Sequence, residues 1–286
     1  MEHSSLPYLP SDLETINGFL RLLNLDLSTK SHTEVLSLYF HHVPFLPAVP
    51  IPCHSPKPET VFRVVRCSEI PRGPARLGHP PAELTPRGRL NIARHPVFYT
   101  SDKPLISILE MNPQHGEELY VGIWNVRNFD DVMICPMLVD YQGSVPVLLK
   151  QKQLLLDSIS KMELEVGRRY LTVYRLMTEL LVGGNHHLSS AIGHFLFNDM
   201  VPRRTDVIIY PSVKANRQHA NFAFSTEMFN SRFHFVGGLC VVVQELAGDQ
   251  QSGRFLCVRQ TTMPFHSVIE WKEEQPPREI ELTVGV

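Results

Sequence analysis

The sequence predicts an α+β fold, because segments typical of strands come first, a helical block follows, and strands then return. Val61 to Val65 (VFRVV) and Leu119 to Val126 (LYVGIWNV) are rich in β-branched and aromatic residues. Between 147 and 198 apolar residues recur at helical spacing, and Asp206 to Val213 (DVIIYPSV) has the composition of a buried strand. We therefore expect a mixed β-sheet core with a helical block inserted between its strands and a helical extension at the N-terminus.

The composition is that of an ordinary globular protein. The chain has 286 residues, of which 43% are hydrophobic and 20% charged. A net charge of −2 gives no general argument for binding to nucleic acid or to a membrane surface, and we expect neither partner. The start of the chain lacks the pattern of a signal peptide, and no apolar run reaches membrane-spanning length, so we expect a cytoplasmic protein.

Cysteine and histidine positions argue against a metal site. The five cysteines are odd in number and form no C-x-x-C pair, so they indicate neither a disulfide framework nor a zinc knuckle. His41-His42 and His186-His187 are adjacent pairs, and adjacent residues on a helix point in different directions. We expect no bound metal.

The chain divides into three expected parts. We expect residues 1–58 to form a helical and proline-rich extension, 59–245 the main domain, and 246–286 a last strand with a peripheral acidic tail. In the extension we predict a helix with a capping box of Ser11 and Glu14, whose buried face comprises Leu13, Ile16, Leu20 and Leu23, with Phe19 as a further candidate.

A second short helix is predicted from Thr33 to Phe40. Six prolines then occur between Pro44 and Pro58. This density excludes helix and central strand, so we predict a strap that covers the surface without joining the sheet.

The stretch from Arg87 to Glu110 (RGRLNIARHPVFYTSDKPLISILE) reads as loop, short strand, turn and helix, with Ser101 and Asp102 as capping candidates. Arg89 precedes Tyr99 by ten residues, and Tyr99 precedes Glu110 by eleven. A planar cation, an aromatic ring and a carboxylate on one strand–helix unit could line one cleft. The alternative is a basic loop, a core tyrosine and a solvated glutamate.

Positive charge gathers before and within this stretch. Lys57 to Arg94 contains eight basic residues against three acidic ones, which would suit an anionic ligand. Arg63 lies in the middle of the apolar segment VFRVV, and an arginine in that position needs a partner or an anionic ligand.

Four segments in order, VFRVV, GRLN, VFYTSDKPLISILE and DVIIYPSV with Asn221 beyond it, resemble the RES domain family over roughly residues 60 to 240. Members of that family have an ADP-ribosyltransferase-like fold and consume NAD, typically as toxins that a partner antitoxin neutralises. The resemblance implies that Glu110, Tyr99 and Arg89 are catalytic. It also implies a set of NAD-binding residues: Arg63, Arg89, Tyr99, Ser212 and Asn221.

Two departures from the family stand out. Leu90 occupies the position where the family's G-R-W-N segment has tryptophan, and both the N-terminal 58 residues and the helical block are longer than in compact members. The resemblance implies an NAD glycohydrolase or phosphorylase, with NAD as substrate. The residues leave the acceptor open: water, inorganic phosphate or a protein side chain. A protein ADP-ribosyltransferase and a non-catalytic nucleotide- or partner-binding module are the alternatives.

Overall fold

In the described residues, a ten-stranded sheet is the frame of the protein. The computed structural model describes residues 10–43, 51–52, 59–183, 186–200, 204–248, 251–262 and 268–284. The strand order is β1-β5-β6-β7-β3-β2-β4-β8-β9-β10, and every neighbouring pair is antiparallel except β5 and β6. The expected α+β class and mixed sheet are therefore confirmed. The strands are β1 (Ile51–Pro52), β2 (Thr60–Val65), β3 (Phe98–Ser101), β4 (Glu118–Val126), β5 (Met133–Pro136), β6 (Val207–Pro211), β7 (Ala220–Phe224), β8 (Phe233–Leu246), β9 (Ser252–Thr262) and β10 (Lys272–Thr283).

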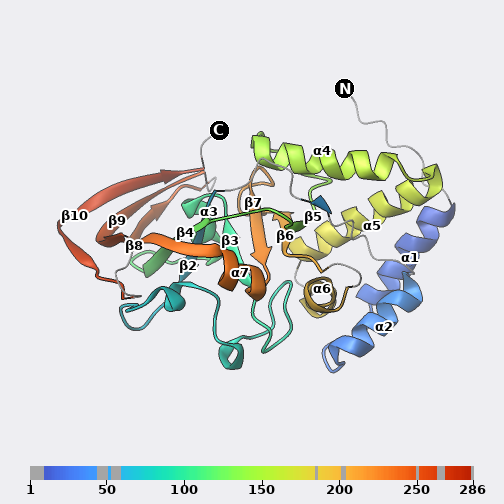
Figure 1. Ribbon diagram of the computed structural model, residues 1–286, viewed down its shortest axis with the longest axis horizontal. Helices are drawn as coiled ribbons and strands as arrows, with labels where there is room; N and C mark the ends of the chain where they lie inside the picture. The colour runs from blue at the N-terminus through green and yellow to red at the C-terminus, as the bar shows by residue number, and fades with distance from the viewer. Residues whose placement is uncertain are drawn as a thin grey trace.

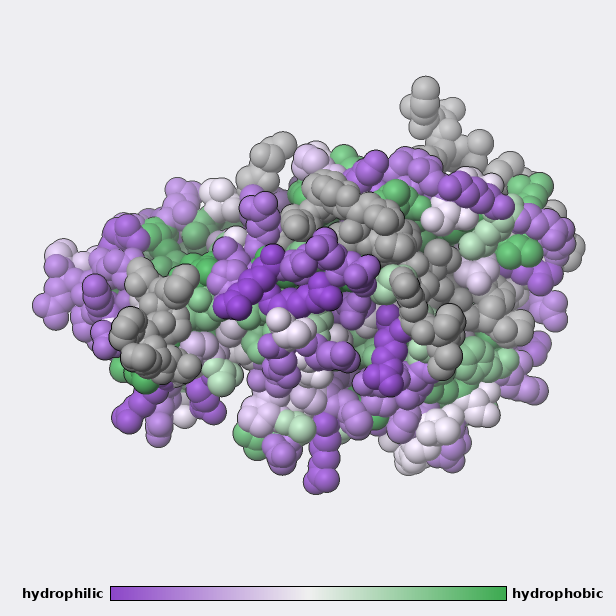
Figure 2. Space-filling model, in the orientation of Figure 1, coloured by the Kyte–Doolittle hydropathy of each residue, from purple (hydrophilic) through white to green (hydrophobic). Residues whose placement is uncertain are grey.

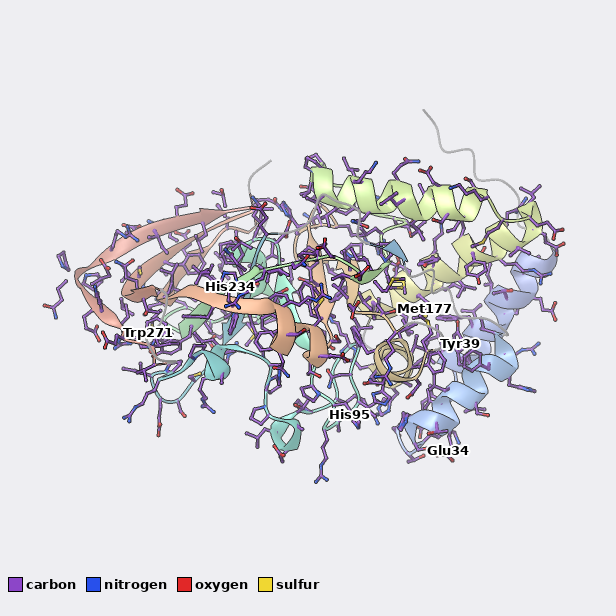
Figure 3. All side chains as sticks on the ribbon, viewed as in Figure 1. Glu34, Tyr39, His95, Met177, His234 and Trp271 are labelled. Atoms are coloured by element: carbon purple, nitrogen blue, oxygen red, sulfur yellow. The ribbon has the colours of Figure 1, made fainter. Side chains whose placement is uncertain are left out.

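Most of the helices pack together at the β5–β6 end of the sheet, while β8, β9 and β10 form the other end (Figure 1). Their shared core includes Tyr39 and Met177, which Figure 3 labels on the helical side. Two short helices, α3 (Pro104–Glu110) and α7 (Thr226–Arg232), lie beside the middle strands. The helices at the β5–β6 end are α1 (Pro10–Leu23), α2 (His32–His42), α4 (Pro146–Ser160), α5 (Leu164–Val182) and α6 (His186–His194), which continues into a π-helical turn (Phe195–Asp199).

The sheet is nearly divided in its middle. β3 pairs with β7 through four residue pairs, and β2 pairs with β4 through six. Between β2 and β3 there is one pair, Phe62 with Ser101. The two strands therefore diverge on either side of that pair, which leaves room for a cleft at the centre of the molecule.

The predicted capping box is in the wrong place. Helix α1 begins at Pro10, so Ser11 lies inside the helix and cannot be its cap. A complete capping box occurs at the start of α2 instead, where the Ser31 hydroxyl accepts from the Glu34 amide and the Glu34 carboxylate accepts from the Ser31 amide.

The buried face of α1 also differs from the prediction. Phe19 and Leu22 are 2% and 0% exposed, whereas Leu13 and Leu20 are 48% and 47% exposed. Gly18 explains why this face of α1 is buried, because a Cβ there would lie 2.2 Å from the backbone oxygen of His42. The glycine lets α2 approach closely, and the neighbouring Phe19 and Leu22 are buried with it. Figure 2 shows hydrophobic side chains exposed over this helical end.

One segment expected outside the sheet belongs in part to it. Ile51–Pro52 pairs with β5 as an edge strand, so the prediction of a strap outside the sheet is wrong for these residues, and 44–50 and 53–58 lie outside the described residues. An edge position tolerates Pro52, because no strand of the described residues pairs with its outer side.

The expected acidic tail is β10, the opposite edge strand, which pairs with β9. Pro276 and Pro277 fall in the gap of the register between Glu273 and Arg278, where no ladder hydrogen bond is required of them. Strands β8, β9 and β10 are continuous neighbours, so the segment after residue 245 extends the same sheet.

Candidate functional site

A cleft of about 310 Å³ opens where β2 and β3 diverge. Its walls come from both halves of the sheet, from α3 and from the loop before β3. Five of the six residues that the sequence proposes for the site line this cleft, and the sixth, Ser212, lies directly behind it. The lining residues are Arg63, Val64, Arg89, Tyr99, Thr100, Ser101, Ser107, Glu110, Met111, Tyr210 and Asn221.

Glu110, the last residue of α3, is held by one of its two carboxylate oxygens. Oε1 accepts hydrogen bonds from Ser212 Oγ at 2.8 Å and from Asn221 Nδ2 at 2.7 Å. Oε2 lies 3.5 Å from Arg89 Nη2, a separation that makes an ion pair but not a good hydrogen bond. The side chain remains 19% exposed. One oxygen therefore fixes the carboxylate, and the other faces the cleft and can accept from a ligand.

The sheet register sets the orientation of the amide that holds Glu110. Ser101, Asn221 and Tyr210 lie directly opposite one another on β3, β7 and β6, so their side chains share one face. Ser101 Oγ donates to Asn221 Oδ1 at 2.6 Å. Since the Asn221 oxygen is occupied, its nitrogen is directed to Glu110.

Ser101 and Asp102 do not cap α3, contrary to the prediction. The cap residue is Lys103, which makes no side-chain cap hydrogen bond, and Pro104 opens the helix. Asp102 instead pairs with Nδ1 of the buried His219 at 2.7 Å. This pair joins the corner between β3 and α3 to the start of β7, on which Asn221 is carried.

Tyr99 presents its ring to the cleft and its hydroxyl to the loop that carries Arg89. The hydroxyl accepts from the Leu90 amide at 2.8 Å and donates to Asn91 Oδ1 at 3.0 Å. Burial raises the pKa of the Tyr99 hydroxyl well above its usual range. The hydroxyl is thus neutral, and it anchors the loop that carries Arg89.

The loop behind Arg89 is also fixed from the helical side. Leu90, at the position where the resembling family has tryptophan, is buried in the core beneath α6. A Cβ on Gly193 of α6 would lie 2.5 Å from the Leu90 carbonyl oxygen, so only glycine allows this close approach. The helix therefore determines the position of the loop.

Arg63 has an unmet hydrogen-bonding capacity at the cleft. Its Nη1 is buried and has no partner among the described residues, and its guanidinium lies 5.7 Å from the Phe98 ring centre. Burial lowers the pKa of Arg63 to about 10, so the group remains a cation at neutral pH. A buried cation with a free donor fits an anionic ligand.

Ser212 and Tyr210 flank Pro211 at the end of β6. Ser212 is fully buried and donates its hydroxyl to Glu110, so it positions the carboxylate and does not line the cleft. Tyr210 lines the cleft and was not predicted from the sequence. Burial raises the pKa of Tyr210, an effect that the charge of Arg89 opposes and that of Glu110 enhances. Its place beside Ser212 in the segment YPS is the signal that could have identified it.

Two further properties were searched for in the described part of the chain. There, no group of three or more histidine, cysteine, aspartate or glutamate side chains is placed to hold a metal ion. No helix in the same residues has both the length and the apolar character needed to cross a membrane. Comparison with models of known protein families and with curated protein sequences finds no match for this chain.

Proposed function

We propose that this protein is an NAD-consuming enzyme of RES type, with an ADP-ribosyltransferase-like core, that cleaves the bond between nicotinamide and ribose. One observation carries the proposal: a single cleft joins a fixed carboxylate, Glu110, to an aromatic wall, Tyr99, and to two guanidinium groups, Arg63 and Arg89. The sequence resemblance assigns the same residues to NAD.

The bond to nicotinamide needs less catalytic machinery than an ordinary glycosidic bond. The pyridinium nitrogen is already positive, so nicotinamide departs as a neutral molecule and no general acid has to protonate it. A single carboxylate can then serve where O-glycosidases use two. Glu110 is the sole carboxylic acid among the described residues that line the cleft, which agrees with this chemistry.

Glu110 would act through Oε2. This oxygen would accept a hydrogen bond from a ribose hydroxyl, and its charge would stabilise the positive charge that develops on the ribose as nicotinamide leaves. Ser212 and Asn221 hold Oε1 and so prevent the carboxylate from turning away. Such fixed orientation is favourable for catalysis because little reorganisation is needed in the transition state.

Arg63 and Arg89 would bind the pyrophosphate. Guanidinium groups form paired, charge-assisted hydrogen bonds with phosphate oxygens, which would satisfy the free donor of Arg63. Binding would also draw Arg89 from its 3.5 Å ion pair with Glu110 and so free Oε2 for the ribose. The Tyr99 ring would then lie against the nicotinamide ring or the ribose.

The acceptor is water or inorganic phosphate in this proposal, and a protein that neutralises the enzyme would be its natural partner. The test is release of nicotinamide from NAD by the purified chain, measured without phosphate, with phosphate, and with a labelled NAD that reports transfer to protein. Release in buffer alone indicates hydrolysis, and release that depends on phosphate indicates phosphorolysis. Label on protein indicates ADP-ribosylation, and an absence of release under all three conditions contradicts the proposal.

A further inference from the structure

A second cavity, of about 160 Å³, lies on the far side of the loop that carries Arg89. Asn91 separates the two, because its side chain lines the second cavity while its Oδ1 accepts from the Tyr99 hydroxyl of the cleft. None of the residues assigned to NAD above lines this second cavity.

Two arginines line the second cavity from different parts of the chain. Arg94 belongs to the loop before β3, and Arg204 precedes β6. Within the described residues, neither has a carboxylate within ion-pair distance, although Glu227 also lines the cavity. Two cations against one acid leave an excess of positive charge there.

The backbone of Arg94 is strained. Its φ is 65°, in the left-handed region that residues other than glycine and asparagine rarely adopt, and its amide donates to the Thr85 carbonyl oxygen at 2.9 Å. Such conformations persist where the surroundings enforce them, and they are frequent at ligand sites.

His194 adds a buried imidazole to the lining of the same cavity. Its side chain lines the cavity although the residue is only 7% exposed. Asn198 Nδ2 donates to the His194 carbonyl oxygen at 2.9 Å and lies 3.1 Å from Nδ1 of the ring. Because that amide nitrogen is a donor, Nδ1 is the acceptor, and the proton of the neutral ring is on Nε2. His95 lies beside this ring, with 4.4 Å between ring centres, near α6 in Figure 3.

We propose that this cavity binds a phosphate group, either free inorganic phosphate or the terminal group of a small phosphomonoester. Arg94 and Arg204 would supply charge-assisted hydrogen bonds from two sides, and His194 would supply a neutral donor from the buried side. The size of the cavity suits a single tetrahedral anion. The inference is independent of NAD cleavage, because it concerns a different cavity and different residues.

The test is calorimetric titration of the full chain, without NAD, with inorganic phosphate and separately with glycerol 3-phosphate, in chloride of constant ionic strength. We expect saturable binding that Arg204→Gln and Arg94→Asn each weaken by about 10-fold or more. Asparagine is chosen at position 94 because it tolerates the left-handed backbone. Arg204→Gln alone decides the question if the other variant does not fold. The compound that binds identifies the source of the phosphate group.

Two control variants locate the anion. Arg127→Gln removes an exposed arginine elsewhere and should leave the affinity unchanged. Arg89→Gln reports on the cleft instead, because Arg89 lines the cleft and not the second cavity. Absence of binding by the unmodified chain, or equal losses in Arg127→Gln and Arg204→Gln, would overturn the proposal. If Arg89→Gln lost affinity for phosphate and Arg204→Gln kept it, the anion would lie in the cleft, and the proposal would be overturned as well.

Discussion

Asn221 donates to Glu110 over 2.7 Å, although 111 residues separate them in the chain. The contact exists because β7, which carries Asn221, pairs with β3, which leads directly into the helix that ends at Glu110. Strand pairing at the centre of the sheet thus builds the candidate site, and none of the residues that line the cleft comes from the helical block between β5 and β6.

Replacing Asn221 tests whether this contact holds the carboxylate. Asn221→Ala leaves Oε1 of Glu110 with one donor instead of two and removes the acceptor of the Ser101 hydroxyl. We expect a loss of about 1–3 kcal/mol in the free energy of unfolding, and slower nicotinamide release. Denaturant unfolding and turnover should be measured on the same preparation. Unchanged values for both would show that the contact is dispensable.

Tyr99→Phe separates the two roles of the tyrosine. The ring remains as a wall, but the Leu90 amide and the Asn91 side chain lose their partner, so the Arg89 loop loosens. We expect a higher KM for NAD, a small change in kcat, and about 1 kcal/mol less stability. A large fall in kcat with KM unchanged would instead make the hydroxyl a proton donor.

Gly193→Ala tests the support that α6 gives to this loop. The added methyl group would collide with the Leu90 backbone, so the loop or the helix must move. Overpacking of this kind costs about 1–3 kcal/mol, and NAD binding should weaken because Arg89 moves with Leu90. Gly248→Ala is the matched control, because a Cβ at Gly248 meets no atom within 4 Å. If the two variants had equal stability and equal NAD binding, the close approach of Gly193 to Leu90 would not constrain the loop.

Arg89→Lys keeps the charge but removes the planar fork of donors. If that fork binds the pyrophosphate, we expect the affinity for NAD to fall by about 10-fold while the fold is retained. Binding of NAD to a slowly reacting variant measures this directly. Unchanged affinity would make Arg89 a loop residue without a role in binding.

Acid should destabilise the protein through His194. Burial lowers the pKa of His194, and the neighbouring His95 and His32 lower it further, while Asp199 raises it. Below the ordinary value of about 6.5 the unfolded chain binds a proton that the folded chain resists, so the free energy of unfolding falls as pH falls. In phosphate-free buffer, lowering the pH should reduce the thermal midpoint of His194→Gln less than that of the unmodified chain. If the thermal midpoints of both proteins fell equally with pH, His194 would not be the source of the acid sensitivity.

Local features of the site were predictable, and long-range ones were not. Tyr99 and Glu110 could be paired from the sequence because they lie on one strand–helix unit, where spacing fixes their relation. Ser101 was predicted as a helix cap because its neighbours in sequence suggest it, but its hydrogen-bond partner is Asn221 on β7. That strand was not predicted, and a cross-strand partner cannot be identified without the register.

The same limit explains the differences in the fold. The apolar residues of α1 allow two buried faces, and the approach of α2 at Gly18 selects the one with Phe19 and Leu22. Proline density argued against a strand in the proline-rich segment, but its described residues Ile51–Pro52 occupy a sheet edge, where proline is tolerated.

The most direct test of NAD cleavage is nicotinamide release by Glu110→Gln. Glutamine keeps the shape and an acceptor but removes the negative charge that would stabilise the developing ribose cation. We predict that turnover falls roughly 10²-fold or more, while the affinity for NAD changes much less and the thermal midpoint shows a folded protein. Glu83→Gln, at an exposed glutamate on a short 3-10 turn, should leave all three unchanged. A folded Glu110→Gln protein with undiminished turnover would contradict the account.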